Sequence, residues 1–175
     1  RTRHFVEQHA DCFHRELLHG HVTGSAWVVN PARDKVLLMH HRKHNEWFQP
    51  GGHADGDNDI LRVALRETHE EVGIAPHQVD VIGCLQAMPT ITGFAVTPIV
   101  GLVRDPVELI IDRSEVEYTF EIPLDFLLNE DNDQLVEREW EGRRFRLREF
   151  HFEDERVWGA TAYMILAFRN FVLNK

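Results

Sequence analysis

The alternation of apolar and polar residues predicts strands and helices that interleave along the whole chain. Strand-like segments bounded by turn residues cover residues 22–29, 35–41, 79–88, 94–103 and 116–122. Residues 135–140 and 144–152 flank Glu141-Gly142 and are typical of a β-hairpin. Helical patterns cover residues 5–18, 59–72 and 160–173, with a single helical turn at 124–128. Because the spacing is not that of regular βαβ units, we predict a mixed α+β or layered α/β domain.

The size and composition of the chain are those of one globular domain. The chain has 175 residues, of which 43% are hydrophobic and 27% are charged. It contains no repeat or linker long enough to divide it, so we expect a single domain over residues 1–175. Residues 1–20 are expected to form a helical N-terminal extension of that domain.

The net charge restricts the class of partner. Asp and Glu number 29 against 19 Lys and Arg, which gives a formal charge of −10. A protein that binds nucleic acid polymers through its own side chains is expected to be basic, so that class is excluded. An anionic small molecule remains a possible ligand if a cation such as a metal ion reverses the local field.

The two cysteines and the hydropathy pattern bear on the compartment. Cys12 and Cys84 have no metal-binding spacing and form no disulfide framework, which favours a reducing, cytoplasmic setting. No apolar run approaches the ~20 residues of a membrane-spanning helix, so we expect no membrane association.

The helix predicted at residues 59–72 carries an unusual cluster of carboxylates. At ~100° per residue, Glu67, Glu70 and Glu71 project from one sector of the helix. A different sector, expected to dock on the sheet, contains Leu61, Leu65, Thr68 and Val72. Like charges so close together repel one another, and a hard divalent cation such as Mg²⁺ or Mn²⁺ would remove the repulsion. The alternative is a solvated surface helix whose acidic residues happen to cluster.

The loop before this helix changes the balance between the two alternatives. Gly51 and Gly52 follow Pro50 and allow the backbone to approach a ligand closely. With the helix they resemble the Nudix signature, in which a Gly, five residues and a Glu precede seven residues and Arg-Glu-aliphatic-x-Glu-Glu-x-Gly-aliphatic. The residues in register are Gly52, Arg66, Glu67, Glu70, Glu71, Gly73 and Ile74.

Two positions of the signature differ in this chain. Asn58 stands where the signature has a Glu that helps to hold the Arg, and Asp55, Asp57 or Asp59 could take over that role. Thr68 stands at an aliphatic position, where its methyl group can pack but its hydroxyl needs a partner. Neither difference affects the three glutamates.

The downstream half of the chain is similar to the coenzyme A diphosphatase branch of the Nudix superfamily. The matching segments lie at 83–85, 90–94, 96–101, 115–116, 122–124 and 158–162. The stretch at 40–50 does not match the segment that this branch has before its Gly-Gly pair. The resemblance covers roughly residues 22–170, and it implies a layered α/β/α sandwich with a mixed central sheet and the signature loop-helix.

The resemblance also implies chemistry, namely hydrolysis of a diphosphate by water attack with the help of metal ions. It identifies Glu67 and Glu71 as metal ligands and Glu70 as a third ligand or the base. The Gly52 carbonyl is a further candidate ligand, and Arg66 is expected to orient the carboxylates. Several family members take an additional acid from a later loop, where Glu115 is the candidate; the alternative for Glu115 is a solvated charge at a strand end.

Aromatic and basic residues near the glycines are candidates for substrate contact. Trp47, Phe48 and Phe94 could stack on a base, or they could belong to the core. Arg42, with its neighbour Lys43, could bind a phosphate or remain solvated.

The histidines at 40, 41, 44 and 53 invite a zinc hypothesis, which we consider the weaker interpretation. His40 and His41 are adjacent on a predicted strand, so their side chains are expected on opposite faces of the sheet.

The leading functional hypothesis is an Mg²⁺- or Mn²⁺-dependent hydrolase that converts coenzyme A or acyl-coenzyme A to phosphopantetheine and 3′,5′-ADP. Other nucleoside diphosphate derivatives (nucleotide sugars, dinucleotides or damaged nucleotides) are alternative substrates. An inactive nucleotide-binding sensor is a third hypothesis, although it is disfavoured because all three glutamates are present. A purely structural domain would leave the carboxylate cluster unexplained. The sequence leaves the oligomeric state open.

Overall fold

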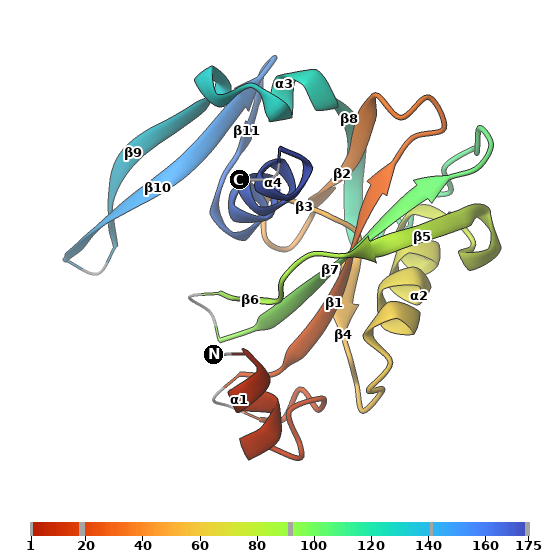
Figure 1. Cartoon of the computed structure of the whole chain (residues 1–175), viewed down its shortest axis with the longest axis vertical. Helices are drawn as coiled ribbons and strands as arrows, with labels where there is room; N and C mark the ends of the chain where they lie inside the picture. The colour runs from red at the N-terminus through yellow and green to blue at the C-terminus, as the bar shows by residue number, and fades with distance from the viewer. Residues whose placement is uncertain (1, 18–19, 91–92, 141, 174–175) are drawn as a thin grey trace.

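A mixed β-sheet forms the centre of the protein, with one long helix against each of its faces (Figure 1). The structure is a computed structural model and describes residues 2–17, 20–90, 93–140 and 142–173. The strands are β1 (Val22–Val29), β2 (Lys35–His41), β3 (Glu46–Phe48), β4 (Gly51–His53), β5 (Val79–Cys84), β6 (Met88–Pro89), β7 (Ala95–Val103), β8 (Val116–Pro123), β9 (Asp133–Trp140), β10 (Arg143–Phe152) and β11 (Glu155–Val157). The helices are α1 (Thr2–Gln8), α2 (Ile60–Val72), α3 (Leu124–Leu128) and α4 (Gly159–Val172), with 3₁₀ turns η1 (Pro76–Gln78) and η2 (Glu130–Asn132).

The central sheet has the order β3-β2-β1-β7-β5, and β4, β6 and β8 pair with β1, β7 and β2 respectively. Strands β1 and β7 run parallel along their length, whereas the other pairs are antiparallel. The sheet is therefore mixed, as the resemblance implied.

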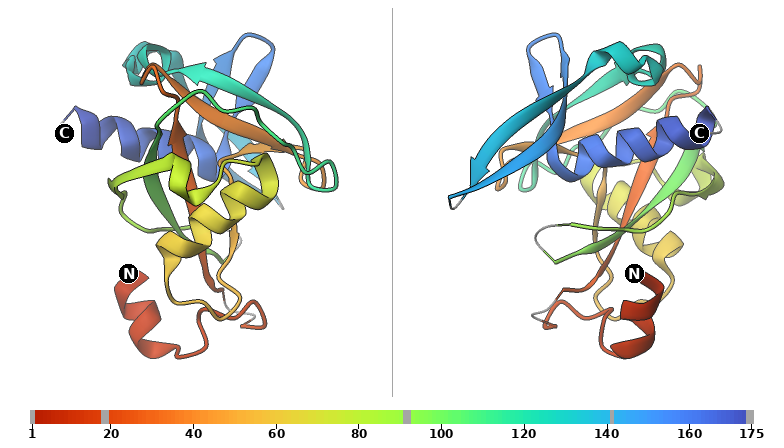
Figure 2. Two further views of the ribbon diagram at one scale, coloured as in Figure 1. Left: turned by 90° about the vertical axis from the view of Figure 1, so that its right-hand side faces the viewer. Right: turned by 60° about the vertical axis from the view of Figure 1, so that its left-hand side comes forward.

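Strand β1 shows why the sheet is covered on both faces. All eight of its residues are buried, and their side chains alternate between two cores. Ala26 and Val28 pack with residues of α2, while Trp27 and Val29 pack with residues of α4. Figure 2 shows α2 in front of the sheet in one view and α4 in front of it in the other. The layered α/β/α expectation is confirmed.

A second, three-stranded sheet of order β11-β10-β9 lies beside α4 and extends away from the main sheet (Figure 1). Two buried carboxylates anchor it. Glu149 accepts two hydrogen bonds from Arg138, at 2.9 and 3.0 Å, and Asp133 accepts one from Arg169 of α4 at 2.9 Å. Pairing with arginine offsets the free energy that burying these charges would otherwise cost. Strands β9 and β10 pair antiparallel as the predicted hairpin requires, while residue 141 of its turn lies outside the described residues.

Three expectations from the sequence are wrong. The helix predicted over residues 5–18 is confined to α1, and turns follow it as far as residue 17; residue 18 lies outside the described residues. The strand predicted over 79–88 divides into β5 and β6 at residues 85–87, because the chain advances four positions from Cys84 to Met88 while the paired residues of β7 advance only three, from Ile99 to Val96. Leu61, expected to dock on the sheet, is 41% exposed, while Ala64 of the same helix is fully buried. Among the described residues, no helix is long and apolar enough to cross a membrane.

Candidate active site

The ends of helix α2 are set by its flanking residues. Asp59 caps the first turn, because its carboxylate accepts a hydrogen bond from the Arg62 amide at 3.1 Å. Gly73 ends the helix in a left-handed conformation with φ of 80°, which glycine adopts at little cost. The hydroxyl of Thr68 finds its partner within the helix, where it donates to the Ala64 carbonyl at 2.7 Å. The helix predicted over residues 59–72 is confirmed as α2, with Asp59 as its N-cap rather than its first helical residue.

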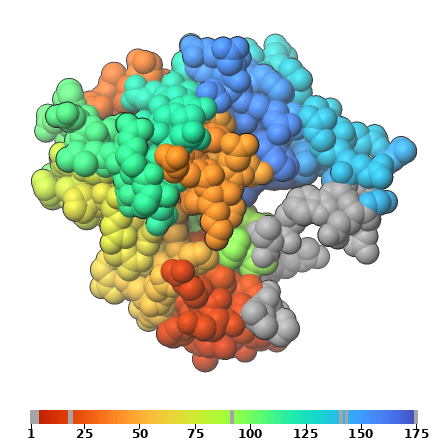
Figure 3. All heavy atoms as spheres, turned by 180° about the vertical axis from the view of Figure 1, so that it is seen from behind, coloured from red at the N-terminus to blue at the C-terminus, as the bar shows by residue number. Residues whose placement is uncertain are grey.

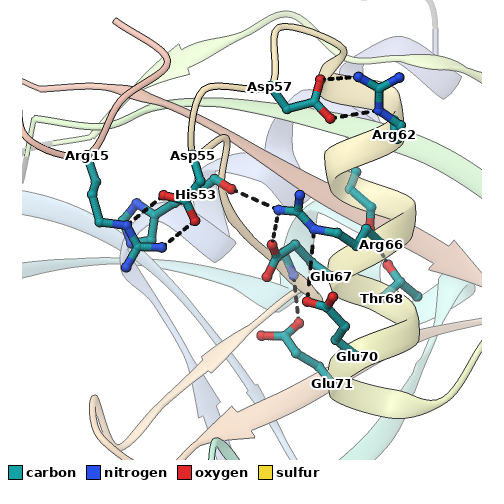
Figure 4. A network of polar contacts seen from close by, with 12 residues as sticks. Arg15, His53, Asp55, Asp57, Arg62, Arg66, Glu67, Thr68, Glu70 and Glu71 are labelled. Carbon is teal, nitrogen blue, oxygen red and sulfur yellow. Dashed lines mark hydrogen bonds and ion pairs between the residues drawn. The ribbon is translucent and has the colours of Figure 1, made fainter. Parts of the chain in front are cut away.

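The three glutamates of α2 lie on the side of the helix that faces the glycine loop (Figure 4). Glu71 is 4% exposed and accepts a hydrogen bond of 2.8 Å from the Gly51 amide. Glu67 accepts one of 2.6 Å from Arg66, and Glu70 lies 4.0 Å from the same guanidinium. The helix thus presents one buried, one half-buried and one exposed carboxylate toward the loop.

The carboxyl group of Glu71 lies in an unusual electrostatic environment. Burial raises the pKa of its carboxyl to about 8, the Gly51 amide opposes that rise, and the nearby charges of Glu67, Glu115 and Glu70 add to it. Burial also raises the pKa of Glu67, opposed mainly by its hydrogen bond with Arg66. Within the described part of the chain, no cationic side chain pairs with Glu71.

Close packing explains the two glycines of the loop. A methyl group added at Gly51 would overlap the backbone of Gly24 and Ser25 in β1, so strand β4 can pair with β1 here only without a side chain. A methyl group added at Gly52 would overlap the carboxylate of Glu67, which would have to move from its present position. Gly51 and Gly52 also pair with Ser25 and Gly24 of β1, so the loop is fixed to the sheet on its other side.

The donor chemistry of this cluster fits a hard divalent cation. The available groups are carboxylates and backbone carbonyls, which Mg²⁺ and Mn²⁺ prefer over sulfur or imidazole. Arg66 engages Glu67, and Glu71 turns one oxygen to Gly51, so the described residues contain no ready-made group of three His, Cys, Asp or Glu side chains around one point. The roles of Glu67, Glu70, Glu71 and the Gly52 carbonyl as ligands stay predictions.

The structure brings Glu115 and Arg42 to the same region. The Arg42 amide donates to the Glu115 carbonyl at 2.8 Å, which joins the turn after β2 to the loop before β8. The charge of Glu115 acts on both Glu71 and His41. The Arg42 side chain is exposed, and its role toward a phosphate stays a prediction.

The three aromatic candidates differ in their surroundings. Phe48 is half-buried and packs against the core on the α2 side of the sheet. Trp47 is 4% exposed, packs edge-on against Phe120 at 4.3 Å between ring centroids, and donates from its indole to Glu155 at 2.9 Å. Of the two alternatives for Trp47, this geometry favours the core over a base-stacking role. Phe94 is half-buried and lies 4.9 Å from the ring of His21 and 5.7 Å from that of His53.

The replacement of the signature Glu by Asn58 is accommodated differently from our expectation. Asp55 pairs with Arg15, Asp57 pairs with Arg62, and Asp59 caps α2, so the hydrogen bonds of all three go elsewhere. Arg66 instead donates to the backbone carbonyl of His53 at 3.3 Å, as well as to Glu67. Sequence reasoning missed Arg15 and His21, because nothing in the pattern before residue 22 indicates contact with the signature loop.

The histidines near the loop divide into separate groups. His40 stacks on Tyr118 and hydrogen-bonds to Glu117, whereas His41 lies against His44 and Phe48. The two side chains point to opposite faces of β2, as the alternation predicted. His53 hydrogen-bonds instead to His21, with 2.6 Å between ring nitrogens.

Comparison with known proteins agrees with this geometry. Residues 20–165 match the NUDIX domain family. The Nudix hydrolase NudL of Pectobacterium atrosepticum is 40% identical over 128 residues, which cover 71% of this chain and 66% of that protein. Nudix hydrolase 15, mitochondrial, of Arabidopsis thaliana is 34% identical over 150 residues, which cover 82% of this chain and 52% of that protein. The chain thus spans about two thirds of the first relative and about half of the second.

A solved structure shares the fold. A C. elegans Ap4A hydrolase, solved as a binary complex, superimposes with a TM-score of 0.54 at 20% identity, covering 59% of this chain and 80% of that one. At this identity the likeness concerns the fold alone. The family match covers most of the chain and includes the glycine loop, α2 and its three glutamates. The chain therefore belongs to the Nudix hydrolase family.

Proposed function

We propose that this protein is an Mg²⁺- or Mn²⁺-dependent hydrolase that cleaves the diphosphate of a nucleoside diphosphate derivative. One observation carries the proposal: Glu67, Glu70 and Glu71 lie together against a glycine loop that leaves no room for side chains, and the buried Glu71 has no cationic partner among the described residues. A bound divalent cation would supply the missing positive charge.

Each polar residue of the site has a part in this chemistry. When bound, the metal neutralises the diphosphate and lowers the pKa of a coordinated water. Glu67 and Glu71 would hold the metal, with the Gly52 carbonyl beside them, and Glu70 would act as a third ligand or accept the proton of the attacking water. Arg66, which already donates to Glu67, would orient that carboxylate. Glu115 would supply the additional acid, since its charge already acts on Glu71.

The leading substrate is coenzyme A or an acyl-coenzyme A, cleaved to phosphopantetheine and 3′,5′-ADP. The segments downstream of residue 83 that resemble coenzyme A diphosphatases support this choice, and the unmatched stretch at 40–50 counts against it. Other nucleoside diphosphate derivatives are the alternative, and an inactive nucleotide sensor is a third possibility. Both cysteines are free, in keeping with a reducing compartment such as the cytoplasm.

A substrate panel tests the proposal. The protein would be incubated with Mg²⁺ or Mn²⁺ and coenzyme A, acyl-coenzyme A, nucleotide sugars or dinucleotides, and the products separated by chromatography. Release of phosphopantetheine and 3′,5′-ADP supports the leading substrate, and turnover of nucleotide sugars or dinucleotides alone supports the alternative. Saturable nucleotide binding without turnover under either metal would contradict the hydrolase proposal and support the nucleotide sensor.

A further inference from the structure

The N-terminal segment is bonded directly to the signature loop, although the two are about forty residues apart in the chain. The Gly56 amide donates to the Phe13 carbonyl at 2.8 Å. The Arg15 guanidinium donates two hydrogen bonds, of 2.6 and 2.5 Å, to the carboxylate of Asp55. Figure 3 shows the N-terminal segment, in red, packed against the gold region of the signature loop. We call these two contacts, Phe13 with Gly56 and Arg15 with Asp55, the clasp.

The loop is strained at the two positions that the clasp holds. Asp55 has a φ of 50° and Gly56 a φ of 87°, so two consecutive residues adopt the left-handed region. Aspartate tolerates that region better than most residues, but it still costs free energy. Such a conformation persists only where surrounding contacts determine it, and the clasp supplies one contact at each residue.

The strained turn is connected to the carboxylates through two hydrogen bonds. Residue 53 precedes the turn, and its carbonyl accepts from Arg66. Arg66 donates through the same nitrogen to Glu67. The position of the His53 carbonyl therefore determines where the guanidinium lies, and the guanidinium determines where the Glu67 carboxylate lies. In this chain Asn58 is exposed and the neighbouring aspartates bond to other residues. The backbone of the loop therefore holds Arg66 where the signature would use a Glu side chain.

We propose that Arg15 is a positioning residue: the clasp sets the signature loop so that the His53 carbonyl holds Arg66, and Arg66 holds Glu67 in place for the reaction. The inference rests on the proposed function for its catalytic readout. The side chain of Arg15 is 55% exposed, so solvent screens its charge and limits what the ion pair contributes to the free energy of unfolding. We expect its main effect to be on the geometry of the loop.

Two variants and a matched control test the proposal. Arg15→Ala removes the grip, and Asp55→Asn removes its charge while keeping a residue that tolerates the left-handed region. Arg62→Ala is the control, since Arg62 makes an equivalent two-bond pair with Asp57 in the same loop, and among the described residues its side-chain ion pairs are with Asp57 and Asp59 and not with the N-terminal segment. We expect kcat to fall about tenfold in both test variants, the usual cost of losing a residue that orients a ligand, with little change in KM. The double variant Arg15→Ala/Asp55→Asn should lose no more than either single variant.

A measurement that needs no turnover accompanies the kinetics. Hydrogen exchange at the Gly56 amide, which bonds to Phe13, is expected to be faster in the Arg15→Ala and Asp55→Asn variants and unchanged in Arg62→Ala. Amides in the middle of α2 should exchange at the wild-type rate in all three.

The outcomes separate this inference from the proposed function. Faster loop exchange together with the kcat loss supports the positioning role. Normal kcat in Arg15→Ala, or an equal kcat loss in Arg62→Ala, overturns it while leaving the hydrolase intact. Wild-type protein that turns over no substrate with either metal overturns the proposed function, and the positioning role with it, whatever the exchange data show about the clasp.

Discussion

The backbone amide of Gly51 donates a hydrogen bond of 2.8 Å to the carboxylate of Glu71. This bond joins β4 to the last turn of α2 and is the contact that most opposes the effect of burial on Glu71. One amide is a weak counterpart for a carboxylate that is 4% exposed, because burying a charge without a full partner costs several kcal/mol. A bound cation, as proposed for this site, would be a stronger counterpart for Glu71 than this amide.

Substitution of Glu71 by Gln tests this arrangement. The amide keeps an oxygen for the Gly51 hydrogen bond but loses the charge, so kcat/KM should fall by about a hundredfold or more if Glu71 is a metal ligand. In the presence of a chelator, the free energy of unfolding should be equal to that of the wild type or higher, since a neutral side chain is cheaper to bury. Both quantities are measured by steady-state kinetics and urea denaturation. A wild-type kcat/KM in this variant would show that Glu71 is not a metal ligand.

Metal binding should be visible as stabilisation. A ligand that binds only the folded protein, present at ten times its Kd, raises the free energy of unfolding by about 1.4 kcal/mol. We therefore expect Mg²⁺ or Mn²⁺ to raise the Tm of the wild type and a chelator to reverse the change, as followed by calorimetry. The Glu71→Gln variant should show little of this shift, whereas Glu137→Gln on the exposed hairpin should show all of it. Equal shifts in all three proteins would place metal binding elsewhere.

Helix α2 could be predicted from the sequence because its start, end and polar face are encoded locally. Asp59 and Gly73 are adjacent to the residues that they cap, and the glutamates repeat at helical spacing. The contact between Arg15 and Asp55 has no such local signal, because it joins residues forty positions apart whose types are common on any surface. The break between β5 and β6 depends on one extra residue opposite β7 between Cys84 and Met88, which apolar content alone does not encode.

Trp47 illustrates a different limit, since an aromatic residue beside a glycine loop suits both a base-stacking site and a core. The structure supplies what the pattern lacks, namely a ring packed against Phe120 and an indole nitrogen bonded to Glu155. Only the partners of the ring, which come from β8 and β11, distinguish the two roles.

Substitution of Trp47 should therefore affect stability more than substrate binding. Trp47→Phe loses the hydrogen bond to Glu155 and part of the ring, and we expect the free energy of unfolding to fall by about 1–2 kcal/mol. KM should stay within about twofold of the wild-type value, since we expect the ring to pack in the core and not to contact the substrate. Denaturation and steady-state kinetics on the same preparation separate the effects. A large rise in KM with an unchanged free energy of unfolding would show that Trp47 contacts the substrate.

The lowered pKa of His41 predicts that the free energy of unfolding depends on pH. Its pKa is lowered, first by burial and then by the neighbouring His44, against the opposing charge of Glu115. Its Nδ1 accepts a hydrogen bond of 3.2 Å from the Lys43 amide, which requires the unprotonated ring. Below the ordinary pKa of 6.5, the unfolded chain binds a proton at this histidine more readily than the folded chain does. The contribution of His41 is therefore complete above that pH and is lost as the pH falls toward the lowered value.

Asparagine at position 41 keeps an oxygen near the place of Nδ1 but does not titrate. The fall in the free energy of unfolding between pH 7.5 and pH 5.5, measured by urea denaturation, should therefore be smaller in His41→Asn than in the wild type. The histidines that are not coupled to His41 contribute equally to both proteins, so the difference between the two falls reports His41 together with its coupling to His44. An identical fall in both would mean that the folded and unfolded chains bind the His41 proton equally well. Burial against His44 and Phe48 would then not change the pKa of His41.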